Sequence, residues 1–235
     1  MRPLPPGWSL HAFGALWLAV PDHLSHLAGL QWLDASQPDA RPVSAGGRQA
    51  AWFVEGAHGP AVLRHYRRGG LRARLGQERY FWLGLARVRA LAEVRVLVHL
   101  KQAGVPVPEP LAAGFWRAGP WYRTAILLHR IPSARPLALC LDDADPGSVA
   151  RVLLEMHAAG VWHADLNAWN ILLDDRQQVW LIDFDRARLG VVSRKQAQRN
   201  WLRLRRSLVK VAGLRGAQWW DGLSLCLPRS SGAMP

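Results

Sequence analysis

Three polar residues in the second half of the chain have the side-chain types and the spacing of a catalytic site. Asp165 precedes Asn170 by five residues, and Asp183 follows Asn170 by thirteen. Phosphoryl transfer from ATP needs a carboxylate that accepts the proton of the attacking hydroxyl, and oxygen ligands that hold Mg²⁺ against the phosphates. Each residue alone could be an ordinary loop residue, but together they predict Asp165 as the catalytic base and Asn170 and Asp183 as metal ligands. We expect His163 to brace this loop rather than to act as a base.

The segments around these residues resemble the catalytic machinery of protein-kinase-like enzymes. His163 to Asn170 matches the loop H-x-D-x-x-x-x-N, and Asp183 with Phe184 matches the start of the metal-binding Asp-Phe-Gly segment. Asp185 stands where most protein kinases have glycine, and it could reach a second metal or cap the next turn. Neither an Ala-Pro-Glu signature nor a long activation segment follows, which favours a small or glycolipid acceptor over a protein.

The elements expected around this site indicate an α+β fold. Helices are predicted over residues 89–102, 146–159 and 193–214, and hairpins over residues 49–66, 111–128 and 171–185. Strands therefore dominate the first half of the chain and helices the second. This order is typical of a bilobal protein-kinase-like fold, with a small strand-rich N-lobe and a mainly helical C-lobe.

The order of the predicted strands and helices divides the chain into three parts. Residues 41–130 are expected to form the nucleotide-binding N-lobe, and residues 131–235 the catalytic C-lobe, which ends in a basic amphipathic helix. Residues 1–40 carry five prolines around short apolar stretches and predict no defined element. We therefore expect them to be an N-terminal extension packed on a domain.

The expected N-lobe contains candidates for holding the nucleotide. Kinase-like folds use a glycine-rich turn, a cation on the third strand and a helix glutamate that orients this cation. Gly46 with Gly47, then Arg64, then Glu93 are the candidates in that order. No lysine precedes Lys101, so the usual strand lysine is absent, and either Arg64 supplies the cation or the site lacks one. Glu93 could instead be a surface ion-pair partner, and the glycines, which lack the G-x-G-x-x-G pattern, could form a plain turn.

Four longer segments resemble one family more closely. They are HADLNAWNILLD, VWLIDFDRAR, LRHYRRGG and ALAEVRVLVHLKQAGVPVPEPLAAG, within about residues 40 to 215. These segments resemble the 3-deoxy-D-manno-octulosonic acid (Kdo) kinases, relatives of the lipopolysaccharide core heptose kinases. The resemblance implies Mg²⁺-dependent transfer of the ATP γ-phosphate to a hydroxyl of the Kdo sugar, the 4-hydroxyl in that family, on a lipid A precursor. It also implies a peripheral protein at the cytoplasmic face of the bacterial inner membrane.

The chain is strongly basic, with 30 lysines and arginines against 17 acidic residues and a net charge of +13. The positive electrostatic field of such a chain attracts nucleic acid, anionic lipid or phosphorylated substrates. The arginines show neither an aromatic stacking platform nor a recognition motif, so we expect no nucleic-acid partner.

The last predicted helix carries a basic stripe opposite an apolar one. The stripe consists of Lys195, Arg199, Arg203, Arg206 and Lys210. It could be a solvated face of a packed helix, or it could contact an anionic membrane surface. Because the catalytic residues lie in an earlier loop, we expect reversal of these charges to leave activity on a soluble acceptor intact.

Several alternatives stay open at this point. The acceptor could be a heptose or an aminoglycoside, since the catalytic loop is common to many kinases. The chain could also be a non-catalytic basic module that binds membrane or nucleic acid, although intact Asp165, Asn170 and Asp183 disfavour this. Cys140 and Cys226 both lie among leucines, which predicts buried thiols in a reducing compartment. The sequence gives no indication of the oligomeric state.

Overall fold

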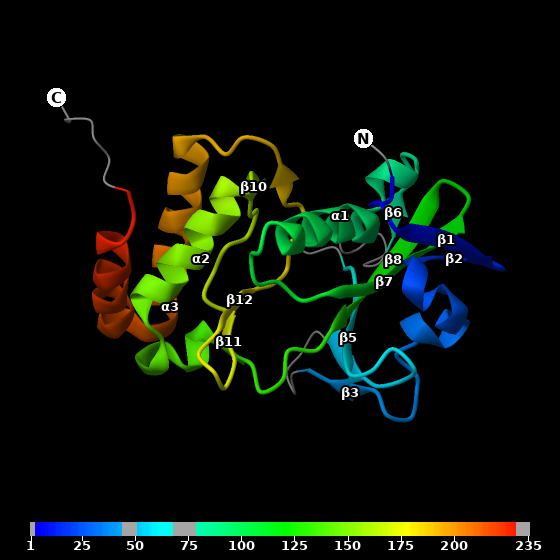
Figure 1. Cartoon of the computed structure of the whole chain (residues 1–235), viewed down its shortest axis with the longest axis horizontal. Coiled ribbons are helices and arrows are strands. Elements are labelled where there is room, and N and C mark those ends of the chain that lie inside the picture. Colours follow the sequence, from blue (N-terminus) through cyan, green and yellow to red (C-terminus); the bar gives the residue numbers. More distant parts are fainter. Residues whose placement is uncertain (1–2, 44–50, 68–78, 229–235) are drawn as a thin grey trace. The chain divides into compact units, whose positions relative to one another are not determined.

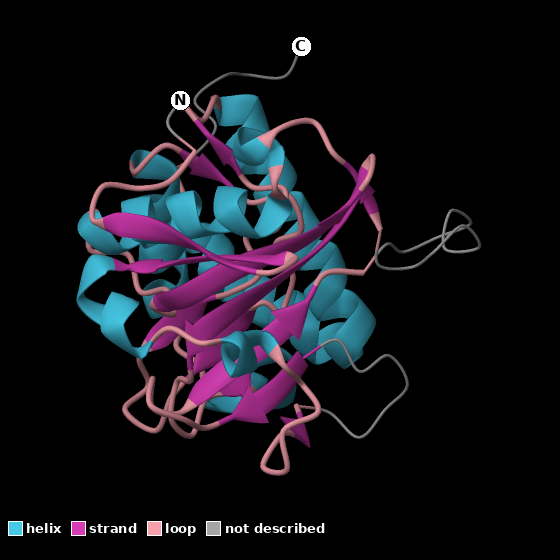
Figure 2. Cartoon of the chain, turned by 90° about the vertical axis from the view of Figure 1, so that its right-hand side faces the viewer, coloured by secondary structure: helices cyan, strands magenta, loops and turns pink. Residues whose placement is uncertain are grey.

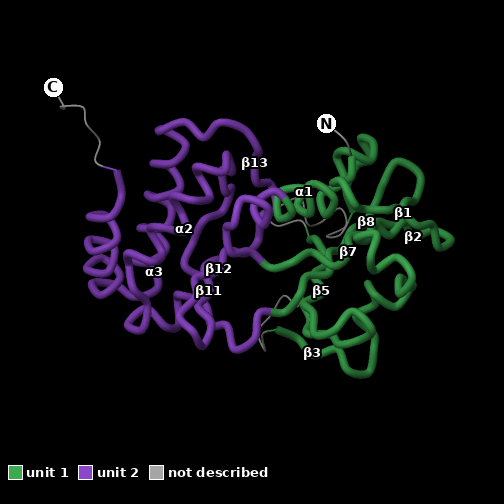
Figure 3. The backbone as a smooth tube through the Cα atoms, viewed as in Figure 1, with its two compact units in different colours: residues 1–98, 108–130 green, residues 99–107, 131–235 purple. Residues whose placement is uncertain are grey.

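The computed structural model describes residues 3–43, 51–67 and 79–228. The chain divides into two compact units, shown in green and purple in Figure 3. Unit 1 comprises Met1–Val98 and Pro108–Arg130, and unit 2 comprises His99–Val107 and Ile131–Pro235. Both units combine helices with antiparallel strands, so the chain is a mixed α and β protein.

Unit 1 is built on an antiparallel eight-stranded sheet, whose strands are magenta arrows in Figure 2. The strands are β1 (Trp8–Phe13), β2 (Leu16–Pro21), β3 (Arg41–Pro42), β4 (Ala51–Val54), β5 (Ala61–His65), β6 (Tyr80–Phe81), β7 (Pro110–Ala118) and β8 (Trp121–His129). Their order is β1-β2-β7-β8-β5-β4-β3, and β6 pairs with β8 (Figure 1). The predicted hairpins β4–β5 and β7–β8 are both confirmed.

The centre of this sheet is buried on both faces. Ala125, Ile126 and Leu127 of β8 are consecutive and fully buried, so side chains on either side of the strand are covered. One face is covered by a short 3-10 helix, whose Trp32 and Leu33 join the core. A Cβ atom at Gly114 would come within 2.3 Å of the Leu33 side chain, so this close approach requires glycine.

Within the first 40 residues, the described part from residue 3 onward contributes two strands to the same sheet. These strands are β1 and β2, followed by the 3-10 helices η1 (Asp22–Leu27) and η2 (Leu30–Leu33). β2 pairs with β7 from Leu16 opposite Trp116 to Ala19 opposite Ala113. The sequence predicts only an extension without a defined element here, because prolines surround these strands and the partner of β2, strand β7, is distant in the sequence.

Helix α1 (Arg89–Gln102) forms as predicted and follows the 3-10 helix η4 (Leu85–Arg87). Leu91, Val94 and Leu97 are spaced by three residues and are fully buried. Glu93 lies between them in the sequence and is only 1% exposed. The helix thus places a carboxylate inside unit 1, where it needs a partner.

The described residues of unit 2 form two α-helices, two short 3-10 helices and two small sheets. Its elements are β9 (Arg135–Pro136), η5 (Leu137–Leu139), η6 (Leu141–Asp143), α2 (Pro146–Ala158), β10 (Val161–Trp162), β11 (Ile171–Leu173), β12 (Val179–Leu181), β13 (Arg188–Leu189) and α3 (Arg194–Leu225). As predicted, Asp145 caps α2 by accepting a hydrogen bond from the Ser148 amide at 2.7 Å, with Pro146 at the first helical position. The predicted hairpin β11–β12 also forms.

Helix α3 starts at a capping box formed by Ser193 and Gln196 and runs beyond its predicted end. The expectation that the helix stops at residue 214 is wrong. Gly213 interrupts it with a φ of 57°, but the chain resumes helical geometry and buries Trp220 and Leu223. A glycine can adopt this left-handed conformation at little cost, so it produces a kink here rather than a stop.

The expectation that both cysteines are buried holds for only one of them. Cys140 is buried, as predicted, but Cys226 is exposed, because it follows the last turn of α3 near the end of the described chain. None of the helices in the described residues combines the length and the apolar character that a membrane span requires.

Candidate active site

A buried histidine organises the loop that carries Asp165. His163 is completely buried. Its Nδ1 accepts a hydrogen bond from the Asp165 amide at 3.1 Å, and its Nε2 therefore carries the proton donated to the Ile182 carbonyl at 3.0 Å. Its ring also packs on Phe184, with centroids 4.8 Å apart. The predicted bracing role is confirmed: His163 ties the Asp165 loop to the Asp183 segment.

Helix α3 fixes the same loop from the other side. The buried Asn200 accepts a hydrogen bond from the His163 amide at 3.3 Å and donates one to the His163 carbonyl at 2.5 Å. Ser207 accepts a hydrogen bond from the Ala168 amide at 3.1 Å. Neither residue was predicted from the sequence. The signal for Asn200 was a polar residue on the apolar face of the helix, where a buried amide needs partners.

The proposed metal ligands Asn170 and Asp183 line one cavity of about 770 Å³ together with Asp165. The Asn170 side-chain amide donates to the Asp165 carbonyl at 2.9 Å, which directs its oxygen away from that carbonyl. The Ile182 amide donates to the Asn170 carbonyl at 3.0 Å and holds the residue before Asp183 against Asn170. Asp183 has a φ of 62°, a left-handed conformation that aspartate tolerates better than most residues.

These donors fit Mg²⁺. One carboxylate and one amide oxygen are hard ligands, and Mg²⁺ usually takes its remaining ligands from water and substrate phosphates. The described residues contain no cluster of three or more His, Cys, Asp or Glu side chains that could hold a metal by themselves. The assignment of both ligands stays a prediction.

Part of the basic stripe on α3 belongs to this cavity. Arg203 donates to an Asp165 carboxylate oxygen at 2.8 Å, and Arg206 and Lys210 line the cavity beside it. The expectation that these cations are separate from the catalytic residues is therefore wrong for three of the five. Sequence spacing placed them on one helical face, but only the tertiary contact shows that this face meets the catalytic loop.

In unit 1, Arg64 and Glu93 form the predicted pair. The Arg64 guanidinium lies 2.5 Å from Glu93 Oε2, and the Tyr66 hydroxyl also donates to this oxygen. Glu93 is thus a buried partner and not a surface one. Contact of Arg64 with ATP phosphates stays a prediction, and Gly46 and Gly47 lie outside the described residues.

Two substitutions of Arg64 should distinguish the effect of its positive charge on ATP binding from the effect of its planar shape. If Arg64 contacts the phosphates, Arg64→Ala should lower kcat/KM for ATP by about a hundredfold, as for loss of other phosphate-stabilising donors. Arg64→Lys should retain part of the activity, since it keeps the charge but loses the planar fork. Steady-state kinetics in ATP check this, with thermal unfolding as a control for the buried Glu93. Parent-like activity of Arg64→Ala would point to Arg67 or Arg68 instead.

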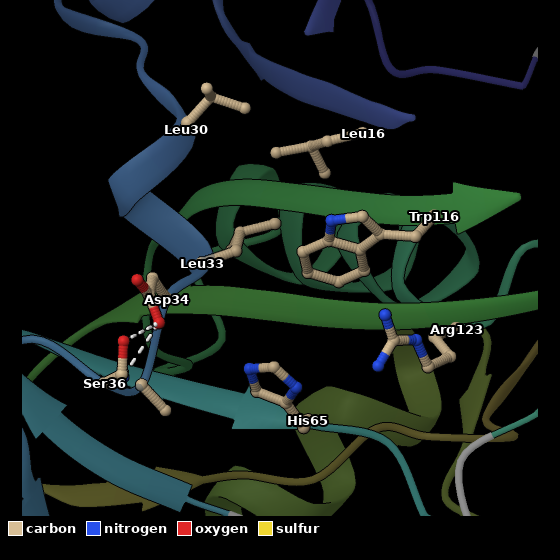
Figure 4. A pocket seen from close by; sticks show the side chains of 9 residues that line it. Leu16, Leu30, Leu33, Asp34, Ser36, His65, Trp116 and Arg123 are labelled. Carbon is tan, nitrogen blue, oxygen red and sulfur yellow. Dashed lines mark hydrogen bonds between the residues drawn. The ribbon is translucent and has the colours of Figure 1, made fainter. Parts of the chain in front are cut away.

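A second cavity, of about 400 Å³, lies in unit 1 (Figure 4). Leu16, Leu33 and Trp116 give it apolar walls, and His65 and Arg123 add polar groups. His65 follows Arg64 on β5, and successive side chains of a strand point to opposite faces. The cavity is therefore on the other face of the sheet from the Arg64–Glu93 pair.

Two histidines of unit 2 make the stability of the fold depend on pH. Burial lowers the pKa of His163 and of His157, whose Nε2 donates to Asn200 at 3.1 Å. Both stay neutral in the folded state and take up protons on unfolding once the pH falls below about 6.5. Their contribution to stability is therefore complete above that pH and is lost progressively as the pH falls toward the lowered folded-state pKa.

We expect the free energy of unfolding to be lower at about pH 5.5 than at about pH 7.5, a range above most carboxyl titrations. Urea titrations at the two pH values measure this difference. The variant His157→Gln, which retains a donor for Asn200, should show a smaller difference. Equal stability of the parent protein at both values would contradict the effect of histidine burial.

Comparison with known proteins places this arrangement in a family. Residues 35–224 match the model of the lipopolysaccharide kinase (Kdo/WaaP) family. A protein of Xylella fastidiosa (strain M12) is 48% identical over 75% of this chain and 72% of its own length. A protein of Xanthomonas campestris pv. campestris (strain B100) is 46% identical over 75% of this chain and 72% of its own length. A protein of Stenotrophomonas maltophilia (strain R551-3) is 45% identical over 76% of this chain and 74% of its own length. All three are named 3-deoxy-D-manno-octulosonic acid kinase. The chain therefore belongs to the lipopolysaccharide kinase (Kdo/WaaP) family and is a phosphotransferase that acts on a hydroxyl group.

Proposed function

We propose that this chain is a Kdo kinase that transfers the γ-phosphate of ATP to the 4-hydroxyl of the Kdo sugar on a lipid A precursor. The observation that carries the proposal is the convergence of Asp165, Asn170 and Asp183 on one cavity. The names of the relatives supply the acceptor. We further propose a protein-kinase-like fold, in which unit 1 is the nucleotide-binding lobe and unit 2 is the catalytic lobe.

In this mechanism the acceptor hydroxyl loses its proton to the Asp165 carboxylate. Its oxygen bonds to the γ-phosphorus while the bond from that phosphorus to the bridging oxygen breaks, and ADP leaves with that electron pair. Asn170 and Asp183 would hold Mg²⁺, and the ion would neutralise charge on the phosphate oxygens. His163 fixes the positions of Asp165 and of the residue before Asp183 through the two hydrogen bonds of its ring.

We also propose that the protein acts as a peripheral protein at the cytoplasmic face of the inner membrane, where a glycolipid acceptor would lie. Lys195 and Arg199 support this, because they are exposed on α3 and do not line the catalytic cavity. Exposed cations attract anionic headgroups, and salt weakens the attraction. Cosedimentation with anionic vesicles that does not decrease at high salt would contradict this part of the proposal.

A panel of acceptors tests the proposed activity. Purified protein is incubated with Mg·ATP and, separately, with a Kdo-lipid A precursor, a heptose-containing core oligosaccharide and an aminoglycoside. We expect one phosphate to be added to the Kdo acceptor, detected as a gain in mass, and much slower turnover of the other two. Preferred phosphorylation of the heptose or the aminoglycoside would replace the proposed acceptor. No phosphorylation of any acceptor would contradict the proposed function.

A further inference from the structure

One face of α3 brings three cations to the cavity that contains Asp165. Arg203, Arg206 and Lys210 follow one another at intervals of three and four residues, which places them on a single helical face. Ser207 lies on this face as well and holds the catalytic loop through the Ala168 amide. The neighbouring Arg205 is exposed but does not line the cavity, because one residue along a helix turns the side chain by about 100°.

The three cations differ in their partners. Arg203 is paired with Asp165 at 2.8 Å, so its charge is already matched by the catalytic carboxylate. Within the described part of the chain, no carboxylate lies within ion-pair distance of Arg206 or Lys210. The cavity wall next to the catalytic residue therefore presents two positive charges that are available to an anionic ligand.

We propose that Arg206 and Lys210 bind the carboxylate of the acceptor sugar and so determine which hydroxyl reaches Asp165. The inference rests on the proposed function, because the acceptor named for the relatives is an octulosonic acid, whose carboxylate is ionised at neutral pH. The Arg206 guanidinium can hold a carboxylate with two parallel hydrogen bonds, and the Lys210 ammonium adds a point charge. A sugar held at its carboxylate presents its ring hydroxyls in a fixed direction.

Anionic oxygens of ATP or of lipid A phosphates would also suit these cations, so the test must separate three sources. Two acceptors are compared: a Kdo-lipid A precursor and the same compound with the Kdo carboxylate converted to its methyl ester. The variants are Arg206→Gln and Lys210→Gln, and Arg205→Gln is the matched control on the same turn. All three positions are exposed, so loss of folding is not expected, and thermal unfolding verifies this.

For the parent, we expect kcat/KM to be about 10-fold to 100-fold higher for the acid than for the ester, as charged hydrogen bonds allow. Arg206→Gln and Lys210→Gln should each reduce this ratio by about tenfold, with an unchanged KM for ATP, and Arg205→Gln should keep the parent ratio. A parent-like ratio in Arg206→Gln would overturn the inference. An increased KM for ATP in these variants would assign the cations to ATP phosphates. An equal loss of kcat/KM for the acid and the ester would assign them to lipid A phosphates. Either result would also overturn the inference. A parent that phosphorylates neither acceptor would overturn the proposed function itself.

Discussion

Asp165→Asn should lower kcat by about a thousandfold while leaving the fold intact, within the range expected for loss of a general base. The backbone of Asp165 makes the contacts that shape the loop: its amide donates to His163, and its carbonyl accepts from Asn167 and Asn170. Asparagine preserves these contacts and can still accept from Arg203, but it cannot take the hydroxyl proton. The substitution therefore removes the proton acceptor and leaves the conformation of the loop unchanged.

Single-turnover phosphorylation of the acceptor measures this loss apart from product release. Asp175→Asn in the turn between β11 and β12 is the matched control, because it removes one exposed carboxylate outside the cavity. The control should react at the parent rate. An Asp165→Asn rate within a few-fold of the parent rate would show that another group accepts the proton.

Asp183→Asn should instead weaken the binding of Mg·ATP. Mutation of a residue that only hydrogen-bonds to a metal ligand typically lowers metal affinity by about 10-fold to 100-fold. Loss of the charge of a ligand itself should therefore raise the Mg²⁺ concentration for half-maximal activity by about tenfold or more. Asparagine is a better choice than alanine here, because the φ of 62° at Asp183 suits asparagine and strains alanine. The variant thus tests the charge and not the backbone.

A Mg²⁺ titration of ATP binding, followed by calorimetry, gives a second measurement that does not depend on turnover. Asp175→Asn again provides the control with one carboxylate fewer. The same Mg²⁺ dependence in Asp183→Asn and in the parent would remove Asp183 from the metal site.

The residues that could be predicted from the sequence are those whose spacing alone carries the information. Asp165, Asn170 and Asp183 lie within nineteen consecutive residues, and a short loop and the hairpin after it bring them to one cavity. The helix α1 and the cap of α2 were also predictable, because periodicity and capping are local.

The contribution of α3 to the site could not be predicted from the spacing of its residues. Asn200 contacts His163, and Arg203 contacts Asp165, across 37 and 38 residues of sequence. A basic stripe opposite an apolar stripe has the same pattern whether its cations meet water, lipid or a catalytic carboxylate. Tertiary packing decides between these environments, as it also decides that β2 pairs with the distant strand β7.

The position of the new phosphate tests the central claim most directly. The parent and Asp165→Asn are incubated side by side with Mg·ATP and a Kdo-lipid A precursor, and the product is analysed by mass spectrometry and by phosphorus–proton correlation NMR. The proposed function predicts a single phosphate on the 4-hydroxyl of the Kdo sugar with the parent, and almost none with the variant. Phosphate on another sugar of the acceptor, or the same amount of product from both proteins, would contradict it.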